Sequence, residues 1–98
     1  MESKVYVLNH SGHDLGKAKR YGTLEVLTSG KVNIFSTDRL LHELTQKLKD
    51  FNWEEDYVLL SGNNILSFMV ARILGALGKP INILVFNFKT SDYVVRSM

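Results

Sequence analysis

The sequence predicts an α/β fold with a mostly parallel sheet. The first observation is the stretch 56–87, which reads as strand, polar turn, apolar helix and second strand. A β-α-β order of this kind favours parallel strands, because the crossover between them needs a helix. The second observation is that the alternation runs through the chain as β-α-β-α-β-α-β-β. The third is its length of 98 residues, which suits one domain. We therefore expect residues 1–98 to form a single compact three-layer Rossmann-like sandwich, whose strand order the pattern leaves open.

The N-terminal part supplies two strands and a weak helix. Residues 4–9 form a near-continuous apolar run, typical of a strand buried on both faces. Residues 15–21 show helical spacing interrupted by Gly16, and residues 23–28 read as the next strand. Residues 29–35 allow either a hairpin or an irregular loop. We favour the loop, because a hairpin would leave little chain to reach the next helix.

The central helix begins near Ser36 or Thr37, which are both good N-caps. Its apolar stripe recurs at helical spacing and comprises Leu40, Leu41, Leu44, Leu48 and Phe51. On its polar side, Glu43 and Lys47 are spaced as an i,i+4 ion pair. After it, Trp53 is expected to cover the sheet edge or a helix end. Residues 92–96 are short and carry an arginine, which predicts an antiparallel edge strand at the C-terminus.

Composition excludes several classes of protein. The chain has no cysteine, which rules out a disulfide scaffold, a zinc ribbon and thiol chemistry. Its net charge of +2 comes without a long basic run, so nucleic-acid binding is not required by the sequence. No apolar run is long enough to cross a bilayer, and strand-forming residues begin too early to leave room for a signal peptide. We expect a cytoplasmic protein with no membrane association, no metal and no cofactor.

The helix over residues 65–77 is apolar on nearly every side. One stripe, formed by Leu66, Met69, Val70, Ile73 and Leu77, is expected to pack on the sheet. The opposite side carries small residues flanked by large apolar ones: Ser67, Phe68, Ala71, Leu74 and Gly75. A second helix of the same domain or the same helix of a second copy would cover this side. The second alternative predicts a homodimer whose interface contains these five residues.

Polar residues gather in loops that the topology places at one edge of the sheet. In a parallel sheet, ligands bind outside the carboxyl ends of the strands, where the loops 9–14, 29–37 and 61–64 are expected. Candidate ligand-binding residues come from the first and third of these loops: His10, Ser11, His13, Asp14, Ser61, Gly62, Asn63 and Asn64. The helix that follows Asn64 offers free N–H groups and a favourable dipole to an anion. The same turn also serves as an ordinary helix cap.

The histidine-rich loop has three interpretations. His10, His13 and Asp14 are chemically suitable metal ligands, although the chain offers no obvious partner cluster. His10 and His13 also suit a general acid–base pair of a phosphodiesterase, with Lys17 or Arg20 to stabilise charge. A third interpretation, with Asp14 or Ser11 capping a short helix, requires no chemistry. We assign no catalytic residue and favour a non-enzymatic protein.

Two resemblances accompany these patterns. Residues 58–63, Val-Leu-Leu-Ser-Gly-Asn before an apolar helix, resemble the turn that holds the ligand in Rossmann domains of CRISPR-associated proteins that bind cyclic oligonucleotides. The stretches 5–9, 24–28, 56–63 and 81–87 resemble the small α/β proteins of phages and other mobile elements, a resemblance that implies no activity.

We expect a small binding module for a nucleotide-like or phosphorylated ligand. The alternatives are a non-enzymatic phage or mobile-element protein that acts through homodimerisation and protein–protein contacts, and a His-dependent phosphodiesterase.

Overall fold

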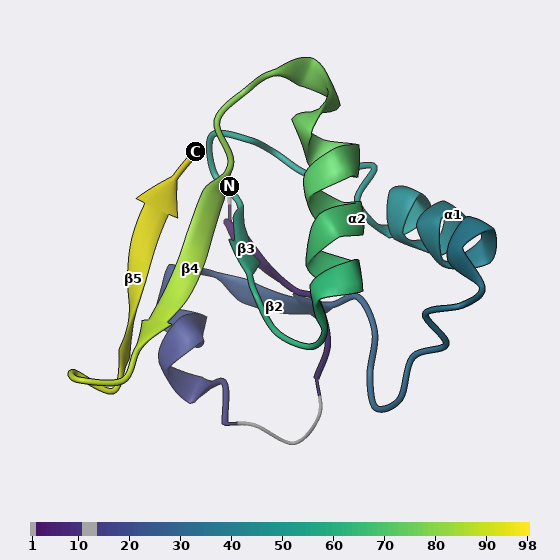
Figure 1. The fold of residues 1–98 in the computed structure, drawn as a ribbon. Helices are drawn as coiled ribbons and strands as arrows, with labels where there is room; N and C mark the ends of the chain where they lie inside the picture. The colour runs from purple at the N-terminus through teal and green to yellow at the C-terminus, as the bar shows by residue number, and fades with distance from the viewer. Residues whose placement is uncertain (1, 11–13) are drawn as a thin grey trace.

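The structure, a computed structural model, describes residues 2–10 and 14–98 and contains a five-stranded sheet in the order β2-β1-β3-β4-β5 (Figure 1). β1 pairs in parallel with β2 and β3, β3 pairs in parallel with β4, and β4 pairs antiparallel with β5. The strands are β1 (Lys4–Val7), β2 (Thr23–Val26), β3 (Tyr57–Leu59), β4 (Asn82–Asn87) and β5 (Asp92–Ser97). The predicted α/β class, mostly parallel sheet and antiparallel C-terminal strand are confirmed.

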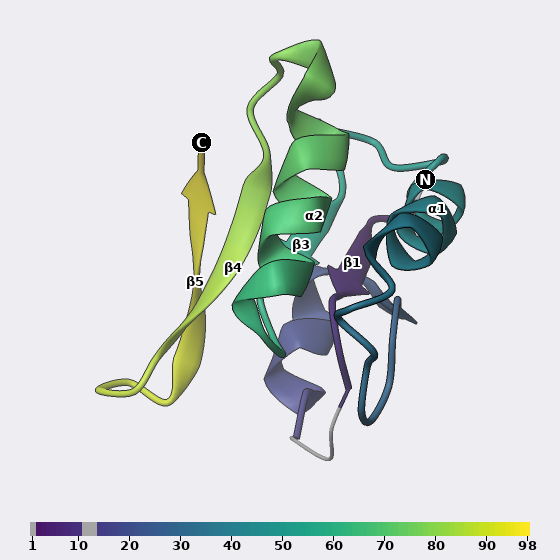
Figure 2. The ribbon, with the colours of Figure 1, turned by 45° about the vertical axis from the view of Figure 1, so that its right-hand side comes forward.

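Helices lie on both faces of the sheet, but unequally. The two α-helices, α1 (Thr37–Lys47) and α2 (Asn64–Leu74), pack on one face and contact each other (Figures 1 and 2). The other face is covered over β1 and β3 by a single 3₁₀ helix, η1 (Gly16–Tyr21), which is the weak helix that the sequence predicts. A second 3₁₀ turn, η2 (Gly75–Leu77), continues α2. The third layer of the sandwich is therefore thin.

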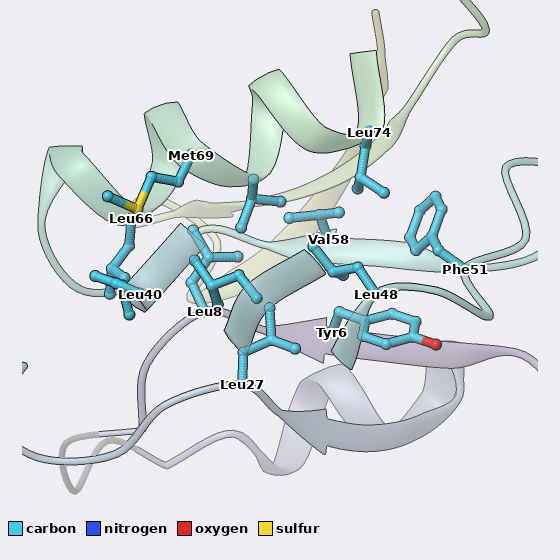
Figure 3. Close-up of a cluster of buried hydrophobic side chains, with 12 residues drawn as sticks. Tyr6, Leu8, Leu27, Leu40, Leu48, Phe51, Val58, Leu66, Met69 and Leu74 are labelled. Carbon is cyan, nitrogen blue, oxygen red and sulfur yellow. The ribbon is translucent and has the colours of Figure 1, made fainter. Parts of the chain in front are cut away.

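The larger core lies between the sheet and the two α-helices. Leu66, Met69 and Leu74 of α2 point toward Tyr6 and Val58 of the sheet (Figure 3). Successive side chains of a strand point to opposite faces, so Val5, Val7 and Leu59 fill the smaller core under η1 instead. Both faces of β1 are consequently buried, as its apolar run predicts.

The ends of α2 follow from local sequence. The Asn63 side chain accepts a hydrogen bond from the Leu66 backbone N–H at 3.0 Å, which caps the helix. After the η2 turn, Gly78 ends the segment with a φ of 69° in the left-handed region. The Trp53 indole donates to the Leu74 carbonyl at 3.0 Å, so the tryptophan covers a helix end, one of its two predicted positions.

Residues 29–35 form a loop, as favoured from the sequence. Ser29 makes only an isolated parallel bridge to His10, and no β-strand is assigned to the described residues 30–35. Ser36 occupies the N-cap position of α1, but its hydroxyl accepts from the Asn33 amide at 3.1 Å and does not cap the helix. The predicted cap position is thus right, and its expected hydrogen bond is wrong.

Three side-chain predictions are wrong for geometric reasons. Leu74 was expected on the outer side of α2 but is 1% exposed, because Leu66, Val70 and Leu74 follow one another at i+4 along the buried stripe. Leu77 was expected to pack on the sheet but lies in the η2 turn, where the change of helical period leaves it exposed. Lys47 does not pair with Glu43, because its ammonium donates to the Leu27 carbonyl at 2.7 Å while Glu43 pairs with Arg39.

Candidate functional site

The loops after β1 and β3 diverge to opposite faces of the sheet. β1 leads to η1 on one face, whereas β3, its neighbour in the sheet, leads to α2 on the other face. Such a switch point opens a crevice at the carboxyl ends of the strands, which is where open α/β sheets bind ligands. The candidate site lies at this point.

A cavity of about 350 Å³ occupies the crevice on the η1 side. Its residues come from three separate segments: the end of β1 and the start of η1, the end of β3, and the β4–β5 hairpin. They are Asn9, His10, Asp14, Leu15, Leu59, Leu60, Ser61, Gly62, Phe86, Phe88 and Tyr93. Its volume lies in the range of small-molecule pockets, about 300–1,000 Å³.

Four of the predicted site residues meet in this cavity: His10, Asp14, Ser61 and Gly62. Asn63 and Asn64 lie next to it at the start of α2 and do not line it. Ser11 and His13 lie outside the described residues.

Ser61 and Asn9 form the polar framework of the cavity. The Ser61 hydroxyl donates to the Asn9 carbonyl at 2.8 Å and accepts from the Asn9 N–H at 3.1 Å, which ties the ends of β1 and β3 together. The Asn9 side chain donates to the Gly30 carbonyl at 3.1 Å and accepts from the Thr28 hydroxyl at 3.0 Å. These groups hold three loops in register, and their hydrogen bonds are already used within the protein.

Gly62 is required by the fold itself. Its φ is 88°, a conformation that L side chains rarely adopt, and an added Cβ would lie 2.8 Å from the Cβ of Asn9. The absence of a side chain at Gly62 therefore makes room for the Asn9 side chain.

Three aromatic side chains form a wall that the sequence did not predict. The ring of Phe86 packs edge-on against Phe88 and Tyr93, with centroid distances of 5.0 and 5.3 Å. Phe88 is 86% exposed, so its face is available at the mouth of the cavity. The only sequence signal for this wall is the i,i+2 spacing of Phe86 and Phe88 at the end of a strand.

The polar groups that face the cavity differ in what they offer a ligand. Burial raises the pKa of the Tyr93 hydroxyl above its usual 10.0, and the nearby Asp14 carboxylate raises it further, so the hydroxyl stays protonated at neutral pH. The Asp14 carboxylate accepts from the Gly16 N–H at 2.8 Å, but the N-cap of η1 is Leu15 and has no side-chain cap, so the predicted capping by Asp14 is wrong. His10 is exposed at the rim. A carboxylate and a hydroxyl therefore border one aromatic wall.

The side chains of Lys17 and Arg20 form their contacts outside the cavity. Lys17 donates to the Ser91 carbonyl, and Arg20 forms an ion pair with Asp92 at 3.0 Å. Among the described residues that line the cavity there is neither lysine nor arginine.

A family model described as phage Pam3 gp32-like protein matches residues 3–97. The chain belongs to the phage Pam3 gp32-like family. Comparison with curated proteins and with solved structures finds no match. The predicted relation to phage proteins is thereby confirmed at the level of the family.

Two further features of the gp32-like chain bear on its chemistry. Within residues 2–10 and 14–98, no three His, Cys, Asp or Glu side chains come together in a way that could hold a metal ion. In the same part of the chain, no helix is both long and apolar enough to cross a membrane.

The outer side of α2 is the second candidate surface of this gp32-like protein. Phe68 is 70% exposed, and Ala71 and Gly75 are exposed beside it. Ser67 and Ala71 border a shallow hollow between α2 and the strands β3 and β4. Of the five residues predicted for a dimer interface, all except the buried Leu74 are at least partly exposed.

Proposed function

We propose that this phage-family protein is a non-enzymatic binding module for a small planar, nucleoside-like ligand. One observation supports the proposal most directly: an aromatic wall and hydrogen-bonding side chains meet in one cavity at the switch point of the sheet. A heteroaromatic ring stacks on the exposed face of Phe88 and meets Phe86 edge-on, because the two phenylalanine rings are nearly perpendicular. Its N–H groups donate to Asp14, and its ring nitrogen or carbonyl accepts from Tyr93.

The described residues that line the cavity include no lysine or arginine, which favours binding over phosphoryl chemistry. A phosphodiesterase has to stabilise negative charge as it develops on the phosphoryl group. Among the described residues, this cavity presents His10 and the carboxylate of Asp14 but no lysine or arginine. A base or nucleoside suits that environment better than a phosphate does.

The test is an NMR titration of the ¹⁵N-labelled protein with adenosine, guanosine, cytidine and uridine. At least one nucleoside is expected to cause saturable shifts in residues 59–62 and 86–93. Phe88→Ala is expected to weaken that binding by about 5- to 150-fold, since stacking contributes about 1–3 kcal/mol per base. The control is Phe35→Ala, which removes an equally exposed phenylalanine that does not line the cavity.

Two results would contradict the proposal. One is no saturable shift with any nucleoside up to ~10 mM, well above the concentration at which even millimolar affinity becomes visible. The other is an equal loss of affinity in Phe35→Ala and Phe88→Ala, which would indicate non-specific contact with exposed rings.

The exposed side of α2 supports a second candidate function, assembly through a homodimer. A surface helix normally presents several charged residues to water, whereas α2 presents Phe68 and Ala71, followed by Gly75, and one charged residue, Arg72. Small residues allow two helices to approach closely, and a twofold contact would cover Phe68 of each copy with the other.

Ala71→Arg tests the dimer. Overpacking costs about 1–3 kcal/mol, and in a twofold interface each copy carries the change, so the variant is expected to be monomeric. Gln46→Arg adds the same charge at an exposed position of α1 and should leave the dimer intact. Light scattering measures both. A wild-type protein that is monomeric at ~100 µM, far above the micromolar constants of ordinary specific contacts, would rule out this function.

A further inference from the structure

A second cavity, of about 300 Å³, lies between the end of β2, the loop after it and α1. The β2 side contributes Leu27, Thr28 and Ser29, and the loop contributes Lys31, Val32 and Asn33. The α1 side contributes Ser36, Arg39, Leu40, Glu43 and Lys47. None of these residues lines the cavity that contains the aromatic wall of Phe86, Phe88 and Tyr93, which we call the aromatic cavity.

The second cavity gathers positive charge. Lys31, Arg39 and Lys47 line it together with one acid, Glu43. Arg39, Glu43 and Lys47 are spaced at i, i+4 and i+8, which places them on one face of α1. This cavity therefore has the lysine and arginine side chains that are not found among the described lining residues of the aromatic cavity, and we call it the cationic cavity.

One of these cations is held in a defined position, and a second forms an exposed ion pair. The Lys47 ammonium donates to the Leu27 carbonyl at 2.7 Å, which holds it against the end of β2. The Arg39 Nε lies 3.5 Å from Glu43 Oε1, and both side chains are half or more exposed to water. An exposed pair of this kind contributes little stability, so an anion of higher charge can compete with the Glu43 carboxylate for the guanidinium.

We propose that this cavity binds a phosphate group of a small ligand. The guanidinium of Arg39 matches two phosphate oxygens, whereas Lys31 and Lys47 supply point charges. Ser29 and Asn33 supply uncharged side-chain donors around the same space. The proposal concerns a site separate from the aromatic cavity and does not depend on nucleoside binding there.

The two cavities belong to neighbouring loops at one edge of the sheet. The His10 N–H donates to the Thr28 carbonyl at 3.0 Å, and the Gly30 N–H donates to the His10 carbonyl at 3.2 Å. His10 lines the aromatic cavity and Thr28 lines the cationic one, so these hydrogen bonds join the loops that line the two cavities. The source of the phosphate, free or carried on a nucleoside, is decided by the experiment.

The experiment is an NMR titration with inorganic phosphate at constant ionic strength. Saturable shifts are expected at residues 28–33 and 36–47. Arg39→Gln and Lys31→Gln should each weaken binding by roughly tenfold, the scale of one lost charge-assisted hydrogen bond. Lys49→Gln removes an exposed lysine near the end of α1 that does not line the cavity, and it should leave the affinity unchanged. All three positions are exposed, and thermal melts verify that the variants fold.

Three results would overturn the proposal. They are shifts that sodium chloride reproduces at equal ionic strength, shifts that are insensitive to Arg39→Gln, and an equal loss in Lys49→Gln. If inorganic phosphate does not bind, the nucleoside proposal is unaffected, because it is tested with uncharged nucleosides and with Phe88→Ala. Adenosine monophosphate distinguishes the two sources. A phosphate carried on a nucleoside should bind more tightly than inorganic phosphate and be weakened by both Phe88→Ala and Arg39→Gln, whereas a free phosphate should respond only to Arg39→Gln.

Discussion

Replacing Leu66 by alanine is expected to lower the free energy of unfolding by about 3–5 kcal/mol. Leu66 is fully buried, and it lies where α2, α1 and the sheet meet in the larger core (Figure 3). Truncation removes three side-chain carbons, Cγ and the two Cδ methyl groups, and leaves a cavity that α2, anchored at its start by the Asn63 cap, cannot easily close. Domains of this size have a total stability of about 5–15 kcal/mol, so the variant should lose a large fraction of its stability.

Urea denaturation followed by circular dichroism measures the change. Ile65→Ala is the matched control, because it shortens the neighbouring side chain of the same helix on its exposed side. The control should change the free energy of unfolding by less than about 1 kcal/mol. A loss below about 1 kcal/mol in Leu66→Ala would mean that the core between α2 and the sheet is not packed as described.

Much of the fold could be predicted because it depends on local sequence. The apolar run of β1 reports burial on both faces, and the short turn between β4 and β5 admits only an antiparallel return. The strand order could not be predicted, because it depends on which face each crossover takes. That choice depends on how α1, α2 and η1 pack together, and the sequence of one segment alone does not indicate it.

The candidate site was predicted only in part for the same reason. The loops around His10 and Ser61 were placed correctly at one edge, since both follow parallel strands. Phe88 and Tyr93 belong to a hairpin whose position beside β3 is set by the strand order. Without that order, two aromatic residues at the end of the chain gave no sign that they would border the same cavity.

Asp56 shows a similar limit for a buried polar group. In the sequence it closes an acidic connection, Asn52-Trp-Glu-Glu-Asp56, which indicates solvent exposure. In the structure it is 4% exposed, and its two carboxylate oxygens bind separate backbone groups. One accepts from the Lys4 N–H at 2.8 Å and the other from the Asn52 N–H at 2.9 Å. The side chain thus ties the start of β1 to the turn that precedes β3.

Asp56→Ala is expected to lower the free energy of unfolding by about 2–3 kcal/mol, because two partly buried N–H groups lose their acceptor. Asp56→Asn retains one acceptor oxygen and faces the other N–H with an amide donor, so it should recover only part of the stability. Glu54→Ala, two residues away and exposed, is the control and should stay within about 0.5 kcal/mol of the wild type. Urea denaturation at neutral pH compares the three variants. If Asp56→Asn were as stable as the wild type, the two hydrogen bonds would not both hold β1 in place, and the stability of this turn would have to come from the packing of Phe51 and Trp53.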